Sequence, residues 1–175
     1  MAHGILIIEN KNENLFLRKR PADFDFKKWR KGDITALIMK MRRIMHAANG
    51  VGLSANQIGL DLRMFVAEVP DSQGGTKFYA VFNPKIEKKS DEKIEFEEGC
   101  LSIPGTWGEV ERPEKIVVSG FDKNGKPVKI KTWGFLARVF QHEIDHLDGK
   151  LFIDRTKKVY KAEPQPKKQS QQKKS

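Results

Sequence analysis

Two histidines and a glutamate near the end of the chain form the pattern with the greatest chemical potential. His142 and His146 are four residues apart, and Glu143 lies between them. On a helix, residues i and i+4 share a face, so the two imidazoles can hold one metal ion. Glu143, one position on, can reach a water at that metal without binding the metal itself. The spacing therefore predicts a metal site with a general base beside it.

A helix must position these side chains, and the sequence predicts one over residues 134–148 that ends at Gly149. A helix that is apolar on two sides is largely buried, so its histidines project into the interior and need partners there. The alternative is a solvated helix with incidental histidines, which this apolar pattern disfavours. The apolar residues are Leu136, Phe140, Ile144 and Leu147 on one side, and Phe135 and Val139 beside the motif.

The third metal ligand is expected upstream of the helix. A catalytic site needs three protein ligands and an open position for water. No histidine follows His146, and the only later glutamate, Glu163, lies in a polar tail. Cys100, the only cysteine, is the best candidate. The alternative is that Cys100 is a small buried apolar residue, and the two interpretations weigh equally.

A glycine-rich segment, residues 49–59, offers a further polar group. Gly50 and Gly52 indicate close backbone approach or unusual dihedral angles, and Gln57 follows in a turn-prone setting. The carboxamide can donate a hydrogen bond to a developing oxyanion. A loop that closes the preceding helix is an equally supported alternative. A phosphate-binding loop is a weak one, because the Gly-Lys-Ser/Thr pattern is missing.

The rest of the chain predicts one α+β domain, with antiparallel strands around the buried helix that carries the HExxH motif. A second helix is predicted over residues 34–48, with Asp33 as its N-cap and His46 at the edge of its buried face. Its methionines, Met41 and Met45, are core residues in this interpretation.

Strands are predicted between the two helices. One hairpin joins residues 63–69 to 77–83, and another joins 115–121 to 126–131 through Asn124-Gly125. A further strand is expected to run from residue 93 into an irregular segment that ends at 105.

The basic charge is concentrated in the last residues. The chain has a formal charge of +10, and residues 157–175 hold seven lysines and one glutamate, which leaves +4 for the body (10 − 6). Residues 1–155 are therefore expected to form the catalytic domain and residues 156–175 a basic tail, disordered from about Ala162. No long apolar run is present, the first residues do not have the pattern of a signal peptide, and a lone cysteine fits a reducing cytosol. A cytoplasmic protein with no membrane or DNA partner is expected.

Three short segments, taken together and in order, resemble the peptide deformylase family. Its motifs are G-Φ-G-Φ-A-A-x-Q, E-G-C-L-S and H-E-x-D-H, and this chain has GVGLSANQ at 50–57, EGCLS at 98–102 and HEIDH at 142–146. The first motif departs once, with Ser54 in place of the usual alanine, and packing is expected to survive because the sizes are similar. Trp107 stands where many members carry an arginine. The resemblance covers roughly residues 4–155.

The resemblance implies a role for each motif residue. Glu143 is the implied general base and later proton donor, and Gln57 and the backbone N–H of Leu101 stabilise the oxyanion. The implied ligands of one divalent metal ion are Cys100, His142 and His146, with ferrous iron in the cell and zinc, nickel or cobalt as alternatives. The implied substrate-binding residues are Val51, Phe135 and Val139, which form the pocket for the first side chain, and Gly52, Glu98 and Gly99, which line the cleft.

The implied activity is removal of the formyl group from N-formylmethionyl peptides, with release of formate. Asp145 is expected to form an ion pair with Arg112. The lysine-rich tail gives salt-dependent affinity for ribosomal RNA in one interpretation and is a solubilising extension in the other, slightly favoured one. Two further functions remain as alternatives: an HExxH zinc endopeptidase, disfavoured by an upstream cysteine ligand, and a degenerate ribosome- or RNA-binding protein, disfavoured because every chemically active motif residue is present.

Overall fold

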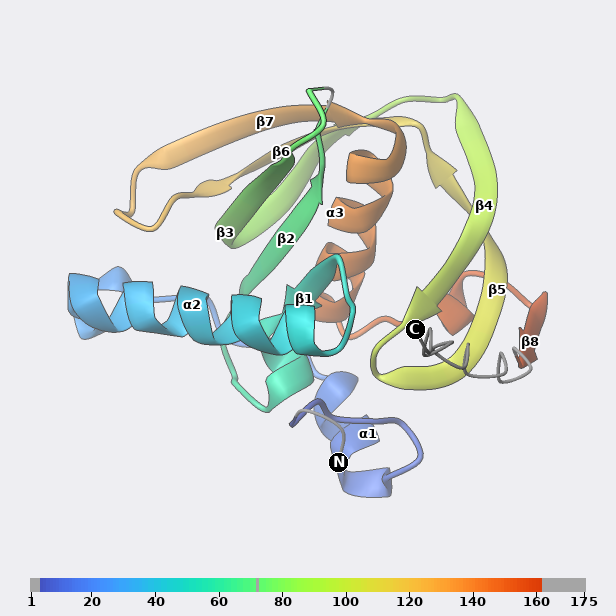
Figure 1. Ribbon diagram of the computed structural model, residues 1–175, viewed down its shortest axis with the longest axis horizontal. Coiled ribbons are helices and arrows are strands. Elements are labelled where there is room, and N and C mark those ends of the chain that lie inside the picture. Colours follow the sequence, from blue (N-terminus) through green and yellow to red (C-terminus); the bar gives the residue numbers. More distant parts are fainter. Residues whose placement is uncertain (1–3, 72, 162–175) are drawn as a thin grey trace, which may run out of the picture.

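Helix α3 (Gly134–Leu147) lies between two antiparallel sheets (Figure 1). The computed structural model describes residues 4–71 and 73–161. The larger sheet has the order β1-β2-β3-β6-β7, and the smaller one has the order β4-β5-β8. The strands are β1 (Gly52–Ser54), β2 (Met64–Pro70), β3 (Thr76–Lys89), β4 (Lys93–Cys100), β5 (Ile103–Pro113), β6 (Lys115–Phe121), β7 (Pro127–Trp133) and β8 (Val159–Lys161). The predicted α+β class with a buried central helix is confirmed.

The predicted helix around the histidine motif is confirmed and ends one residue early, at Leu147. One side packs against the larger sheet through apolar residues that include Phe140 and Ile144. Gly149 follows with φ 70°, and a Cβ there would overlap the backbone of Arg18, so only glycine fits this turn. The helix is therefore held on both sides and at its end, as a precise site requires.

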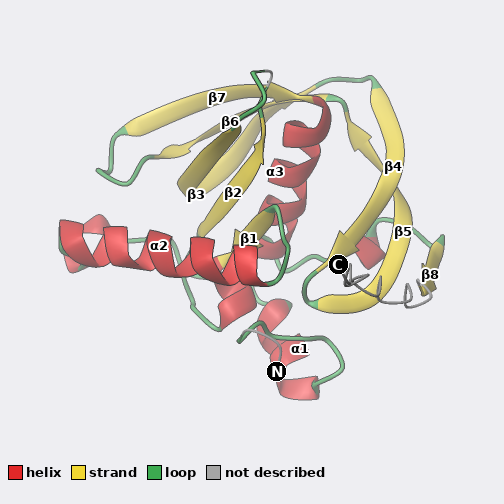
Figure 2. Cartoon of the chain, in the orientation of Figure 1, coloured by secondary structure: helices red, strands yellow, loops and turns green. Residues whose placement is uncertain are grey.

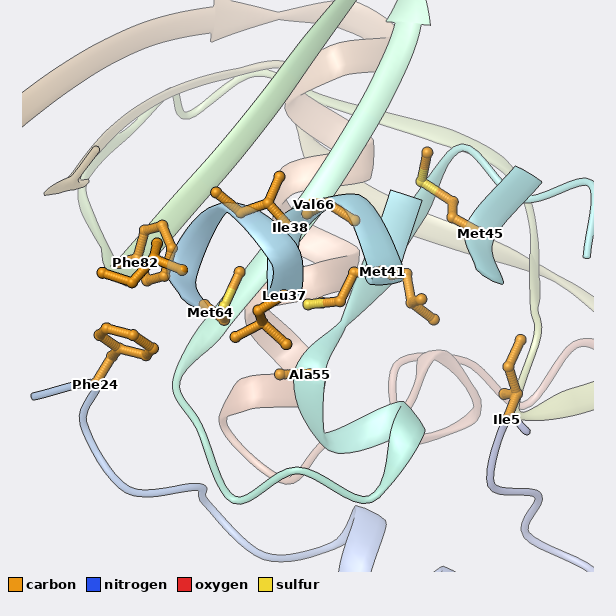
Figure 3. Packing of buried hydrophobic residues seen from close by; sticks show 12 residues of the cluster. Ile5, Phe24, Leu37, Ile38, Met41, Met45, Ala55, Met64, Val66 and Phe82 are labelled. Carbon is orange, nitrogen blue, oxygen red and sulfur yellow. The ribbon is translucent and has the colours of Figure 1, made fainter. Parts of the chain in front are cut away.

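Helix α2 (Lys31–Ala47) crosses the face of the larger sheet (Figures 1 and 2). The predicted apolar stripe is confirmed, because Met41 and Met45 are fully buried in the core cluster of Figure 3. The predicted N-cap is wrong: the helix begins at Lys31, and Asp33 lies within its first turn, where it accepts a hydrogen bond from Arg30 Nε at 2.9 Å. This carboxylate therefore pairs with the Arg30 side chain and does not accept a hydrogen bond from the backbone N–H groups at the helix end.

The smaller sheet was only half predicted. Within residues 93–105, the predicted strand is present as β4, but the irregular segment expected to follow it turns and pairs back as β5, with Gly99 opposite Trp107. Strand β8 then pairs with β5, although it lies beyond residue 155. The disorder expected from Ala162 falls outside the described residues. Prolines and glycines, which weaken a strand pattern, interrupt β5 at Pro104, Gly105 and Gly108.

Short helices and turns complete the fold. Both predicted hairpins are present, β2 with β3 and β6 with β7. The short helices are α1 (Lys11–Leu17) and the 3-10 turns η1 (Phe26–Lys28), η2 (Ala55–Ile58) and η3 (Phe152–Asp154). None of the helices in the described part of the chain has the length and apolar character needed to span a membrane.

Glu68 on strand β2 binds Arg42 on helix α2, and its ionised carboxylate stabilises the fold. Arg42 donates two hydrogen bonds of 2.7 Å to Glu68, and this contact lowers the pKa of Glu68 from 4.5 to about 2. Burial opposes the shift, while Thr76 and His46 support it. His46 is half exposed, so its predicted boundary position is confirmed.

Replacing Glu68 with glutamine is expected to lower the free energy of unfolding at pH 7. The folded-state pKa is the lower one, so the stabilisation is fully present above pH 4.5 and is lost as the pH falls through about 2. Denaturant unfolding of wild type and variant at several pH values measures this difference, which should shrink toward acid. Glu92→Gln removes an exposed carboxylate and should show no such trend; an equal trend in both variants would contradict the assignment.

Candidate active site

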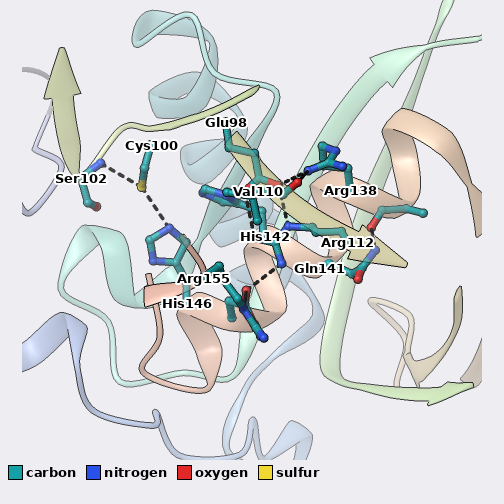
Figure 4. A network of polar contacts seen from close by, with 12 residues as sticks. Glu98, Cys100, Ser102, Val110, Arg112, Arg138, Gln141, His142, His146 and Arg155 are labelled. Atoms are coloured by element: carbon teal, nitrogen blue, oxygen red, sulfur yellow. Dashed lines mark hydrogen bonds and ion pairs between the residues drawn. The ribbon is translucent and has the colours of Figure 1, made fainter. Parts of the chain in front are cut away.

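Helix α3 and the end of strand β4 bring three potential metal ligands together. His142 and His146 follow one another on the helix, with ring centroids 5.0 Å apart. Cys100 ends β4 and places its Sγ 3.2 Å from His146 Nε2 (Figure 4). One ligand atom from each of these three residues lies within 4.8 Å of the other two. Among the described residues, these three make up the whole group. One cation can therefore contact all three.

The charges around this group fit a bound cation. Burial lowers the pKa of His142, but Cys100 and Glu98 outweigh burial and raise it well above 6.5. These neighbours therefore favour positive charge at this point, which a cation bound to the neutral ring would supply. Glu98 Oε2 lies 3.1 Å from His142 Nδ1, which leaves Nε2 for the cation. Burial and the neighbouring His142 lower the pKa of His146 and keep it neutral, the form that ligates metals. A His₂Cys set suits zinc or a similar transition metal.

Glu143 lies buried beside these ligands on the turn of α3 that faces strand β1. Burial raises the pKa of its carboxyl group from 4.5 to about 7, with Ser54 and His142 acting in the opposite direction. A group whose pKa is near neutrality can both accept and return a proton. A Cβ on residue 52 would overlap this carboxylate, so Gly52 is required by the close approach of β1.

Gln57 is buried next to the sulfur and has a defined orientation. Its Oε1 accepts a hydrogen bond from the backbone N–H of Ser54 at 2.9 Å. The amide nitrogen therefore points the other way, 3.1 Å from Ser102 Oγ and 3.8 Å from Cys100 Sγ. A donor held at this position faces the space beside the three ligands. Leu101 follows Cys100 and lines the same cleft.

A cleft of about 910 Å³ opens over the group. His142, Glu143 and Cys100 line it, while His146 lies beneath. The residues predicted to bind substrate all line this one cleft, which brings together β1, β4 and α3: Val51, Gly52, Glu98, Gly99, Phe135 and Val139.

Two other lining residues, Phe96 and Arg138, were missed from sequence. They line the cleft together with Trp107, which the sequence marked only as a departure from the family pattern. The ring of Trp107 lies against Gly99, where a Cβ would come within 3.1 Å of it. Arg138 precedes His142 by four residues and donates to Glu98 Oε1 at 2.7 Å. Its helical spacing was the available signal, since i and i+4 share a face.

A buried ion-pair network stands behind the site. Arg112 donates to Glu98 at 2.5 and 2.8 Å and to Asp145 at 2.8 Å, which confirms the predicted pair of Asp145 with Arg112. Arg155 binds the same aspartate (Figure 4). Burial alone would raise the pKa of Glu98, but Arg112 and His142 hold it well below its usual value. The ionised Glu98 in turn fixes the ring of His142.

Replacing Asp145 with asparagine is expected to lower the free energy of unfolding by about 3 kcal/mol, because it leaves buried Arg112 short of a partner. The side chains of Arg112 and Asp145 are 3% and 8% exposed. Chemical denaturation at neutral pH measures the loss. Asp33→Asn breaks only an exposed pair and should change stability by less than about 0.5 kcal/mol. Similar small losses in both variants would show that the buried network contributes little.

Comparisons with known proteins agree with this geometry. The family model described as "Polypeptide deformylase" matches residues 5–162. Peptide deformylase 2 of Gloeobacter violaceus is 39% identical over 133 residues, which are 76% of this chain and 71% of that protein. Peptide deformylase of Elusimicrobium minutum is 43% identical over 153 residues, 85% of each chain.

Solved structures show the same relationship. A probable peptide deformylase from Synechococcus phage S-SSM7 superimposes with a TM-score of 0.77 at 39% identity, covering 87% of this chain and 98% of that one. A class I type b peptide deformylase from Acinetobacter baumannii with Met-Ala-Ser bound gives 0.78 at 30% identity, covering 87% and 96%. With its Cys-His-His group in place, the chain belongs to the peptide deformylase family of metal-dependent amidohydrolases.

Proposed function

We propose that this chain hydrolyses the formyl amide of N-formylmethionyl peptides, with one divalent cation held by Cys100, His142 and His146. The observation that supports this proposal is that the three ligand residues lie together, and that Cys100, His142 and the buried Glu143 line one cleft. The family membership supports the reaction, and the bound Met-Ala-Ser of the Acinetobacter baumannii relative has the sequence of a deformylated peptide.

The side chains divide the proton transfers and the charge stabilisation between them. When bound, the cation supplies Lewis-acid chemistry at the ligand triad, activating water and polarising a carbonyl oxygen. Glu143 takes a proton from the attacking water and delivers it to the amine nitrogen as the carbon–nitrogen bond breaks. Gln57 Nε2 and the Leu101 N–H donate to the developing oxyanion. The products are formate and a free amino terminus.

The apolar part of the cleft is the proposed pocket for the methionine side chain. Val139 is buried at its floor, whereas Val51 and Phe135 are 40% and 50% exposed at its rim. Covering such exposed apolar groups with a substrate side chain is favourable. Gly52, Glu98 and Gly99 line the neighbouring wall, where a peptide backbone can approach closely.

Ferrous iron is the proposed cation in the cell, and zinc, nickel or cobalt are the alternatives. A thiolate with two imidazoles accepts each of these ions. A cysteine and ferrous iron are both oxidised readily, so purification without oxygen is required. Metal analysis of protein isolated from cells decides among the ions, and zinc as the main ion would contradict the iron assignment.

We also place the reaction in the cytoplasm and retain ribosome contact by the basic tail as a prediction. Residues 162–175, which lie outside the described part of the chain, can be removed without touching strand β8. Ribosome co-sedimentation of full-length and truncated protein at low salt is the measurement. Equal binding of the two proteins would contradict a role for residues 162–175.

Formate release tests the reaction itself. Metal-loaded protein is incubated with formyl-Met-Ala-Ser, and both formate and peptide fragments are measured. Formate without internal cleavage is the expected result. Internal cleavage would indicate the endopeptidase, and neither product from metal-loaded protein would contradict both enzymatic functions.

A further inference from the structure

The serine that replaces the usual alanine of the first motif contacts the proposed general base directly. Ser54 is completely buried, and its Oγ lies 2.7 Å from Glu143 Oε2 and 3.0 Å from the Glu143 carbonyl oxygen. Packing alone is the role expected from its size. These two contacts give the hydroxyl a polar role that an alanine methyl group cannot fill.

The carboxylate is the stronger of the two acceptors. A hydroxyl carries one proton, so Ser54 donates to one oxygen at a time. Hydrogen bonds to a charged group are shorter and stronger than neutral ones, and the contact with Oε2 is the shorter of the two. Glu143 is 3% exposed, so bulk water cannot replace this donor. The hydroxyl therefore fixes one oxygen of the carboxylate.

Strand β1 holds the other carboxylate oxygen as well. Residues two apart in a strand face the same side, so Gly52 and Ser54 both face α3. Oε1 lies against Gly52, which lines the cleft together with Glu143. The backbone N–H of Ser54 also holds Gln57 Oε1. One residue thus orients both the proposed base and the proposed oxyanion donor.

We propose that Ser54 is a positioning residue for the deformylation reaction. Its hydroxyl holds Oε2 of Glu143 and leaves Oε1, on the side of Gly52, directed to the cleft to exchange the proton with water and the leaving amine. This role rests on the proposed function. It predicts a loss in the chemical step and no loss in the binding of substrate or metal.

Replacing Ser54 with alanine is expected to lower kcat about tenfold, because a buried charged acceptor loses its donor. KM should stay within about twofold, and metal content should match the wild type, since no ligand or cleft contact is removed. Formate release from formyl-Met-Ala-Ser by metal-loaded, full-length protein gives both constants. Thr132→Val is the matched control: it removes another buried hydroxyl, one whose oxygen has no hydrogen-bond partner in the described part of the chain, and it should keep the wild-type kcat.

A double-mutant cycle separates positioning from packing. Glu143→Asp shortens the carboxylate by one methylene and withdraws it from Ser54, so Ser54→Ala should change kcat less than about twofold in that background. An equal tenfold loss in both backgrounds, or a loss confined to KM, would overturn the proposal. The deformylase assignment is judged separately: inactive wild type contradicts that assignment, whereas active wild type with an equally active Ser54→Ala variant contradicts only the role of Ser54.

Discussion

Replacing Glu143 with alanine is expected to lower kcat for formate release by about a thousandfold, within the range of general acid–base catalysis. The carboxylate is the buried group of the cleft whose pKa, about 7, suits both halves of the proton transfer. It is not among the three grouped ligand residues, so the metal content should stay unchanged. Steady-state assays on metal-loaded protein, paired with metal analysis, measure both quantities.

Glutamine at position 143 is the matched variant, because it keeps the shape of the side chain and a hydrogen-bonding oxygen for Ser54. It should lose nearly as much activity as alanine, since an amide cannot accept and return the proton. Substantial activity in the glutamine variant would show that Glu143 acts by shape or polarity and that another group moves the proton.

Replacing Cys100 with alanine is expected to remove both metal and activity. Two imidazoles alone bind a divalent cation weakly compared with a set completed by a thiolate. After dialysis, the variant should retain less than about a tenth of the metal bound by wild type, as measured by atomic emission. Activity should fall to the background of the assay.

His46→Gln is the control for this experiment. It removes a histidine that contacts Glu68 at 2.8 Å and is not among the three grouped ligand residues, so its metal content should equal that of wild type. Full metal retention by Cys100→Ala would place the third ligand elsewhere. Comparable loss in both variants would indicate that destabilised protein, and not a missing ligand, releases the metal.

Local patterns predicted the parts of the fold that depend on neighbours in sequence. The spacing of His142 and His146 is a property of one helix, and the Asn124-Gly125 turn is a property of one hairpin. Helix α3 and the β6–β7 hairpin were therefore correct. The prediction that Asp33 is the N-cap was wrong. Its carboxylate has two possible local partners, the helix end and Arg30, and the sequence does not show which contact is stronger.

Contacts between segments far apart in the chain could not be predicted from the sequence. Ser54 and Glu143 are 89 residues apart, and no periodicity relates a three-residue strand to a helix turn. Strand β8 was missed for the same reason, because its pairing partner β5 lies about fifty residues upstream. Cys100 was predicted only in part. Its thiol chemistry and its being the single cysteine made it a candidate ligand, but only the fold brings it next to His146.

The placement of Cys100 on β4 and the histidines on α3 makes the cation a cross-link between the small sheet and the central helix. The unfolded chain separates these ligands by 46 residues, so it binds the ion poorly. By mass action, free metal therefore draws the chain toward the folded state, by about 2.7 kcal/mol at a hundredfold excess over Kd. Growth of cells without sufficient metal should thus shorten the lifetime of the protein as well as abolish its activity.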